Sequence, residues 1–178
     1  MAEFNLPALN RSLHLPDGRL MTMRKSVAAD VDAMVAMFEH GKMLKQQDGD
    51  DAWDRRAFRD EVPRWIEEGY MHTIEVDYMP AAAARLTTTD EEMWGEWSGQ
   101  RSEQEESVNA MYAHKIVRGP LFGGMGKIVI DELATFAQEN GADYVRLDYP
   151  ADSRFLASYY PSLQFTPVGV KEIVRTDQ

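Results

Sequence analysis

Apolar residues return at the helical interval in several stretches of the chain. In the first, residues 31–38, they stand at positions i, i+3, i+4 and i+7, so one face of a helix is apolar. Ser26 precedes this stretch as a candidate helix cap, and Gly41 follows it as a residue that often ends helices. We predict a helix here, with a polar loop at residues 46–51.

Two further helices follow from the same spacing. Residues 58–66 carry an apolar stripe, and Pro63 within it predicts a kink or a late start, because proline lacks the N–H that a helix interior needs. Residues 126–140 carry another stripe and are followed by Gly141, the usual type of residue just beyond a helix.

Alternation with a period of two predicts the first strands. Residues 70–78 alternate apolar and polar side chains, which is typical of a half-buried strand. Residues 80–84, a proline and four alanines, are interpreted as the link to a second strand at residues 85–89, rich in threonine. We expect these two strands to form a hairpin. Residues 19–24 have the pattern of an edge strand.

The last third of the chain is predicted to alternate strands and helices. A strand at residues 107–117, the helix at 126–140 and a strand at 144–148 follow one another, and such crossovers join parallel neighbours. A helix capped by Asp152 or Ser153 comes next, and residues 165–174 are predicted to form a closing strand.

The turn before the helix at 126–140 contains Gly123, Gly124 and Gly126. Glycine leaves the backbone open to a ligand, and the first amides of a helix have no partners within the helix, so this turn is suited to bind a phosphate. The spacing fits neither a P-loop nor a dinucleotide fingerprint. The alternative is a turn that only reverses the chain.

Length and charge narrow the class of protein. The 178 residues suit one domain, which we place at residues 19–178 after an extended N-terminal segment, residues 1–18. The net charge of −11 argues against nucleic acid as a partner. No apolar run is long enough for a membrane span, and no secretory signal is recognised, so a soluble cytoplasmic protein is expected. The four histidines lack the spacing of metal ligands, so no metal site is predicted.

The region around the glycine turn resembles the GNAT family of N-acetyltransferases. Gly124-Met125-Gly126 matches the Gly-x-Gly of the family's pyrophosphate turn, residues 143–148 look like its fifth strand, and residues 155–160 look like its fourth helix. The sequence departs from the family at Leu121, where Gln or Arg is usual, and at Gln164, where glycine is usual. The similarity is best over residues 108–169.

The resemblance implies an α+β fold of the three-layer type. The family has a mixed, mostly antiparallel twisted sheet with helices on both faces. At its centre a parallel strand pair splays apart, here expected around Ile116 and Val145, and the gap receives the pantetheine arm of acetyl-CoA. The implied cofactor contacts are main-chain groups and nearby polar side chains of Ile116, Val117, Arg118, Gly123, Gly124, Met125, Gly126, Lys127 and Ser153.

The resemblance also implies direct transfer from acetyl-CoA to an amine. Tyr160 aligns with the family's tyrosine that protonates the leaving thiolate, and Tyr159 is the competing assignment; the alternative for either is packing under the sheet. No carboxylate stands where some members carry a glutamate base, near Ala110. His114 is the candidate base, or else a structural residue, and Glu75 or Asp77 could act through water.

The predicted function is therefore acetyl-CoA-dependent N-acetylation of a small-molecule amine. The main rival is a non-catalytic protein of the same fold that binds an acyl-CoA as a sensor or scaffold, and a structural subunit without a cofactor is a third reading. Residues 90–107 form a long acidic excursion that contains Trp94 and Trp97. These tryptophans suggest a packed lid or the contact of a homodimer.

Overall fold

The computed structural model of the protein describes residues 7, 9–47, 49–51, 53–94 and 109–171. The described elements are β1 (Asn10–His14), β2 (Leu20–Lys25), a 3-10 turn η1 (Ala28–Asp30), α1 (Val31–Gln47), α2 (Phe58–Glu67), β3 (Met71–Val76), β4 (Met79–Thr87), α3 (Glu91–Trp94), β5 (Ala110–Arg118), α4 (Met125–Glu139), β6 (Tyr144–Leu147) and α5 (Arg154–Ser162).

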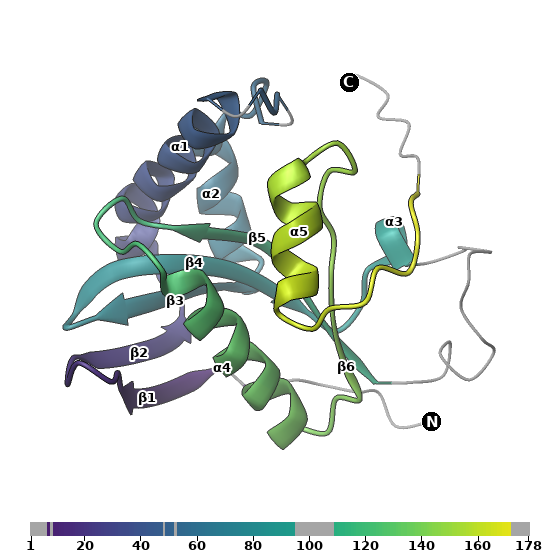
Figure 1. Cartoon of the computed structure of the whole chain (residues 1–178). Helices are drawn as coiled ribbons and strands as arrows, with labels where there is room; N and C mark the ends of the chain where they lie inside the picture. Colours follow the sequence, from purple (N-terminus) through teal and green to yellow (C-terminus); the bar gives the residue numbers. More distant parts are fainter. Residues whose placement is uncertain (1–6, 8, 48, 52, 95–108, 172–178) are drawn as a thin grey trace.

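The six described strands form one sheet in the order β1-β2-β3-β4-β5-β6 (Figure 1). Neighbours from β1 to β5 are antiparallel, and β5 and β6 are parallel. The helix α4 joins the parallel pair, as the strand–helix–strand pattern predicts. The α+β fold class is confirmed. The parallel pair lies at one end of the described sheet rather than at its centre.

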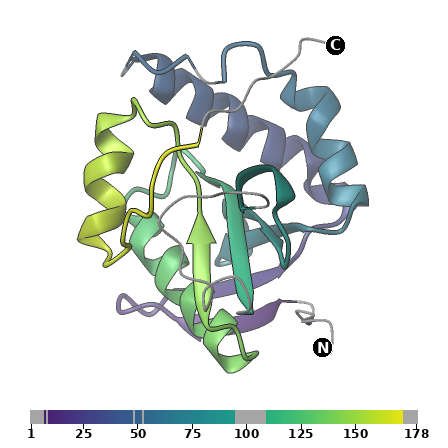
Figure 2. The same ribbon diagram turned by 90° about the vertical axis from the view of Figure 1, so that its right-hand side faces the viewer.

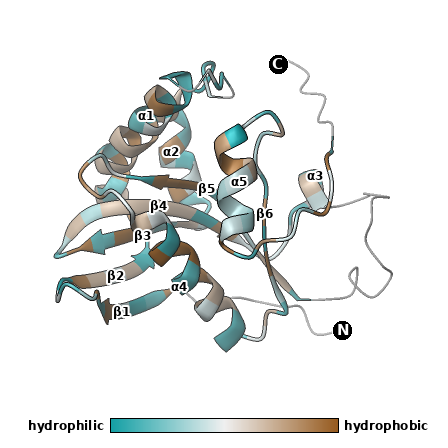
Figure 3. Cartoon of the chain, viewed as in Figure 1, coloured by the Kyte–Doolittle hydropathy of each residue, from teal (hydrophilic) through white to brown (hydrophobic). Residues whose placement is uncertain are grey.

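Helices cover both faces of the sheet, and each face has its own hydrophobic cluster. The helix α4 buries Val129 and Leu133 against residues of β3, β4 and β5, while α1 and α2 bury Phe38 and Trp65 against the opposite face. Figure 3 shows apolar and polar segments alternating along α1 and α4, in line with their amphipathic spacing. Among the described helices, none combines the length and the apolar character that a membrane crossing requires.

The N-terminal segment is more regular than the sequence predicts. Residues 10–14 form the strand β1, which pairs antiparallel with β2, so the expectation of an irregular lead-in over residues 1–18 is wrong for this part. Leu9 and Leu15, on either side of β1, are buried in the α4 cluster. Arg11 forms ion pairs with Glu132 and Glu139 of α4. The strand is anchored by separate leucines on either side of it and by one charged residue within it. The apolar–polar alternation along it is therefore weak, and the sequence does not predict the strand.

The first helix is longer than predicted. Gly41 does not end α1, which continues to Gln47 and so includes the first two residues of the loop expected at residues 46–51. A Cβ at Gly41 would lie 3.0 Å from the Trp53 ring and 3.1 Å from the Val117 side chain, so glycine here allows close packing. Ser26 is not the cap either; its hydroxyl is buried and lies 2.8 Å from the Thr73 hydroxyl, and Val27 is the N-cap of η1.

The predicted hairpin exists, but its turn lies elsewhere. Asp77 and Tyr78 have φ of 48° and 66° and form the tight turn, so residues 80–84 belong to β4 rather than to a link. All four alanines are buried, with Ala83 facing α1 and α2 and the other three facing α4. Small side chains let both helical layers approach the sheet. Alanine therefore marks close packing here rather than the absence of a strand.

Two other expectations differ from the structure. The helix α2 begins at Phe58, ahead of Pro63, so the proline does not delay it. The predicted closing strand is absent from residues 165–171, and residues 172–174 lie outside the described part. Gln164 takes a positive φ of 70° just after α5, which turns the chain at this point.

His72 on β3 is expected to make stability depend on pH. Its side chain is 7% exposed, and burial lowers the pKa of the imidazole from 6.5 to about 4, although its Nδ1 lies 2.9 Å from the Tyr70 carbonyl oxygen. Between pH 6.5 and about 4 the unfolded chain binds a proton here and the folded chain does not. Stability should therefore fall by about 3 kcal/mol as the pH falls through this window.

Urea unfolding of the wild type and of His72→Gln at a series of pH values measures this effect. The difference between the two free energies of unfolding should change by about 3 kcal/mol between neutral pH and pH near 4. Two curves that stay parallel over this range would show that His72 does not titrate in this way.

Candidate functional site

A cavity of about 2270 Å³ opens where β5 and β6 part. Their parallel pairing runs from Ala110 beside Tyr144 to Ala113 beside Leu147, where β6 ends, while β5 continues to Arg118. The divergence therefore begins after Ala113. It does not begin at a pair formed by Ile116 and Val145, because Val145 pairs with Met111. Figure 2 shows the two strands side by side, with α5 beyond the end of β6.

A bulge in β5 accompanies the divergence. Arg85 of β4 pairs with His114 and Ala83 pairs with Val117, so Lys115 and Ile116 together stand opposite the single residue Ala84. Lys115 has a φ of 50°, a conformation that costs energy for a residue with a side chain. Bulges bend a strand and re-aim its side chains. The backbone of β5 from His114 onward is thereby turned away from β6.

The cavity lining includes four of the nine residues expected to contact a cofactor, Ile116, Val117, Arg118 and Ser153. Ser153 is the N-cap of α5, and its hydroxyl oxygen accepts a hydrogen bond from the amide of Leu156 at 3.4 Å. The sequence offered Asp152 or Ser153 for this cap, and Ser153 fills it.

The glycine turn, which carries the other five, lies outside this lining and forms the start of α4. Gly124 is the N-cap, with a φ of 77°, and a Cβ on Gly123 or Gly124 would meet nothing within 4 Å. The side chain of Met125 is buried in the core, so only its backbone faces the turn. Lys127 pairs with Asp131 at 2.6 Å. The turn thus exposes helix-opening amides next to open space, as an anion site requires.

Gly126 has a further contact that the sequence does not reveal. A Cβ at this position would lie 2.5 Å from the Tyr159 hydroxyl, so Tyr159 of α5 reaches over the first turn of α4. Tyr160 instead lies in the cavity lining, buried among the rings of Tyr149, Tyr159 and Phe165. The two tyrosines therefore occupy different surroundings.

The pKa of each hydroxyl is raised. Burial is the main cause in both, followed by the charge of Asp148 for Tyr160 and of Asp131 for Tyr159. Each hydroxyl therefore keeps its proton at neutral pH. The choice of Tyr160 over Tyr159 as proton donor stays a prediction.

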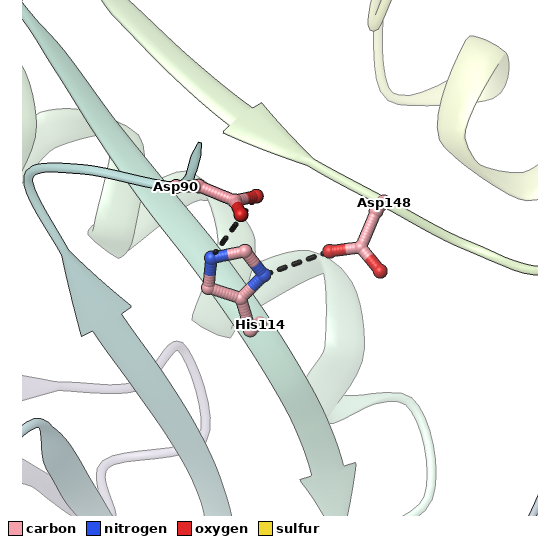
Figure 4. Close-up of side chains that lie close together, drawn as sticks. All are labelled: Asp90, His114 and Asp148. Carbon is pink, nitrogen blue, oxygen red and sulfur yellow. Dashed lines mark hydrogen bonds and ion pairs between the residues drawn. The ribbon is translucent and has the colours of Figure 1, made fainter. Parts of the chain in front are cut away.

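His114 lines the cavity and lies between two aspartates (Figure 4). Its Nδ1 is 2.7 Å from Asp148 Oδ1, just beyond β6, and its Nε2 is 3.7 Å from Asp90 Oδ2, just after β4. The side chains of Asp90 and His114 are 9% and 12% exposed. The Tyr112 ring lies parallel to the imidazole ring, with the two ring centroids 6.3 Å apart.

The hydrogen bonds of His114 define its chemistry. A neutral imidazole that donates Nδ1–H to Asp148 carries a lone pair on Nε2, and this lone pair faces the Asp90 carboxylate. Neither Nε2 nor Asp90 Oδ2 has a hydrogen-bond partner among the described residues, although both atoms are buried. Two acceptors 3.7 Å apart that face each other favour a proton on one of them or a hydrogen-bond donor that contacts both.

The sequence did not predict this group of three. The spacing of the histidines predicted no metal site, yet one histidine and two aspartates from distant segments bring possible ligand atoms within 4.8 Å of one another. In the sequence, the position of Asp148 was a signal for this group, because it ends a predicted strand that was expected to lie parallel to the strand of His114. No pattern in the sequence pointed to Asp90. Glu75 and Asp77, named as alternatives to His114, lie elsewhere: Glu75 bonds Arg24, and Asp77 accepts from the Leu20 amide.

An aromatic wall borders the same site. Trp94 of α3 packs on Tyr112 with ring centroids 6.1 Å apart, and the Arg146 guanidinium lies 4.7 Å from the Trp94 ring. Arg146 also donates to the Tyr112 hydroxyl at 3.0 Å. Trp94 is thus packed against residues of β5 and β6, whereas Trp97 lies outside the described residues.

Comparisons with known proteins add the following. No family model matches the chain, and no curated protein matches it by sequence. Among solved structures, a GNAT-family acetyltransferase from Listeria monocytogenes is 19% identical, with a TM-score of 0.69 over 90% of this chain and 94% of that one. A ribosomal-protein-alanine N-acetyltransferase from Brucella melitensis biovar Abortus is 13% identical, with a TM-score of 0.61 over 88% and 99% of the two chains.

A third match was solved with coenzyme A bound. It is an aminoglycoside N-acetyltransferase that is 15% identical, with a TM-score of 0.55 over 91% of this chain and 98% of that one. All three matches span nearly the whole of both chains, and all three are acetyltransferases. The strand order, the diverging parallel pair and these likenesses agree, and the chain has the fold of the GNAT family of acetyltransferases.

Proposed function

We propose that the protein is an acetyl-CoA-dependent N-acetyltransferase that acts by direct transfer on the amine of a small molecule. The observation that carries the proposal is the position of the Asp90–His114–Asp148 group at the open edge of β5, in the wall of the same cavity. A proton acceptor thus stands beside the strand edge to which a thioester arm can bind. The coenzyme A complex of a structural neighbour supports the choice of cofactor.

The residues present fit coenzyme A. Unpaired backbone groups of β5 beyond Ala113 suit the amides of a pantetheine arm, and the opening amides of α4 suit a pyrophosphate. Arg118, which lines the cavity, supplies positive charge. Lys127, next to the glycine turn, is paired with Asp131 and could bind a phosphate only by leaving that partner. Acetyl-CoA supplies the acetyl group as a thioester. The protein's part is to position the amine and to move protons.

The Asp90–His114 pair suits a protonated amine. In the proposal, an ammonium group lies beside Asp90 Oδ2 and His114 Nε2, which are 3.7 Å apart, and donates a hydrogen bond to each; His114 takes one of its protons. Asp148 orients the imidazole and stabilises its protonated form. The freed amine nitrogen would then attack the thioester carbonyl that acetyl-CoA supplies, and coenzyme A would leave as the thiolate. The nitrogen would lose its second proton to solvent as the amide forms.

Two further groups of the protein would act on the developing oxyanion and on the departing thiolate. A backbone N–H near Ile116, beside the bulge, would stabilise the developing oxyanion. Tyr160, which lines the cavity, would protonate the departing thiolate. Tyr159 is the alternative donor, since its hydroxyl lies at the start of α4.

Two measurements test the proposal in sequence. Calorimetric titration with acetyl-CoA is expected to show one site per chain, and an assay of free thiol with a panel of amines is expected to show release that depends on the amine. Binding without thiol release across the panel would favour the acyl-CoA sensor or scaffold. The absence of any binding would contradict both readings.

A further inference from the structure

Positive charge gathers in one corner of the cavity, although the protein as a whole carries a net charge of −11. Arg56, Arg85 and Lys115 all line the cavity. Arg56 is neutralised by Glu61 at 2.9 Å. The corner lies on the side of the sheet covered by α1 and α2, away from α4 and its glycine turn, because Lys115 packs on Trp65 of α2.

Lys115 has no ion-pair partner among the described residues. Its Nζ lies 4.4 Å from the centroid of the Trp65 ring. Burial, and after it the charge of Arg56, lowers the pKa of Lys115 to about 8, with Arg85 acting in the same direction and Glu61 and Asp148 opposing. The bulge places this residue at a positive φ. A costly backbone conformation thus holds a partly buried ammonium at the cavity.

Arg85 is only partly satisfied. Its Nε is buried and has no hydrogen-bond partner among the described residues, and its Nη2 lies 3.5 Å from a half-exposed Glu68. The guanidinium also lies 5.4 Å from the centroid of the Tyr70 ring. A buried N–H without a partner is costly, and Nε–H together with an adjacent Nη–H can donate two parallel hydrogen bonds to a carboxylate.

The register of the sheet connects this corner to His114. Arg85 stands directly opposite His114 in the β4–β5 pairing, so the two side chains leave the same face of the sheet. Directly opposed residues have Cβ atoms about 5 Å apart. Lys115 follows His114 in the bulge. A ligand with its amine at His114 would therefore place the atoms that lie a few bonds from that amine close to Arg85 and Lys115.

We propose that the acceptor carries a carboxylate close to its amine, as an amino acid does, and that Arg85 and Lys115 bind this carboxylate. The inference rests on the proposed function, which supplies the amine site at Asp90 and His114. It narrows the acceptor from amines in general to amines with an adjacent anionic group. Lys115 is on this view a determinant of acceptor specificity rather than a group that takes part in acetyl transfer.

The test compares matched acceptors and matched variants. Each amino acid is assayed beside its amide, which keeps the amine and lacks the carboxylate. The wild type is expected to prefer the acids. Lys115→Met is expected to lower kcat/KM for the acids by about 10- to 100-fold, the loss typical of a charged hydrogen bond, and to leave the amides nearly unchanged. Lys115→Arg, which keeps the charge, should retain most of the preference.

Lys45→Met is the matched control. Lys45 lines the same cavity and also lies over a tryptophan, at 5.2 Å from the Trp53 ring centroid, but it is already paired with Asp50 at 2.5 Å. This control should not alter the preference for acids. Calorimetry with acetyl-CoA on each variant verifies that the fold and the cofactor site are intact.

Each failure has a distinct meaning. Equal use of acids and amides by the wild type would overturn this inference and leave the proposed function standing. Weaker acetyl-CoA binding by Lys115→Met, with an unchanged preference, would assign Lys115 to the cofactor and overturn it too. Thiol release with other amines but with no amino acid and no amide would overturn this inference and leave the proposed function standing. The absence of thiol release with every amine tested would overturn the proposed function, and this inference with it.

Discussion

Replacing His114 with glutamine is expected to lower kcat for amine acetylation by about 100- to 10,000-fold, the range over which a general base contributes to catalysis. Glutamine keeps a polar side chain of similar length but cannot accept a proton at neutral pH. His114 is the only described histidine that lines the cavity, and its Nε2 faces Asp90 without a hydrogen-bond partner among the described residues. Calorimetry should show that acetyl-CoA still binds.

The control for this variant is His14→Gln, at an exposed position at the end of β1, which should leave kcat unchanged. Asp148→Asn is expected to lower kcat less than His114→Gln does, with little effect on KM for acetyl-CoA, because Asp148 acts through the imidazole. If His114→Gln turns over as fast as the wild type, the proton leaves by another route, such as a water chain.

The spacing of apolar residues correctly predicted the helices that have one strongly apolar face. The helices α2 and α4 were predicted within one or two residues, because each has an apolar face and a glycine just beyond its end. The parallel pair followed from chain order, since a strand, a helix and a strand in succession join parallel neighbours. The GNAT-like fold itself was predicted from the resemblance around residues 124–126, and the structural likenesses agree with it.

Where the pattern is weak, the prediction failed for physical reasons. The alanines at residues 81–84 face both hydrophobic clusters, so β4 shows no alternation. The turn at Asp77 and Tyr78 uses positive φ without glycine, and nothing in the local sequence demands it. Gly41 resembles a helix end but packs in the middle of α1, because Trp53 comes close to its Cα.

Part of the candidate site was likewise predicted from the sequence, and part of it was not. His114 was predicted as a base from its place on the strand, but its partners Asp90 and Asp148 come from segments 58 residues apart in the sequence and meet only in the fold. The role of Lys115 depends on a bulge, which appears only when the register of β4 against β5 is known. A single sequence can therefore name candidate side chains, while the contacts that set their chemistry need the structure.

An aromatic cluster around Phe38 packs α1 and α2 onto the sheet, and it includes Trp65, the residue under Lys115. Phe38 of α1 is completely buried, with ring centroids 5.1 Å from Phe58, 5.3 Å from Trp65 and 5.7 Å from Trp53. Phe38→Ala is expected to lower the free energy of unfolding by about 3–5 kcal/mol, because it removes buried apolar surface and leaves a cavity that rigid aromatic neighbours cannot fill. This is a large share of the roughly 5–15 kcal/mol typical of a domain.

Urea unfolding measures the change as a lower midpoint with an unchanged slope. The matched control is Phe155→Ala: Phe155 also stacks on an aromatic ring, that of Tyr159 at 5.3 Å, but its side chain is 61% exposed, and a loss within about 1 kcal/mol is expected. Equal midpoints for the two variants would contradict the cluster as the main support of α1 and α2. Because Trp65 belongs to this cluster and lies under Lys115, such a result would also weaken the case for a fixed ammonium in the cavity.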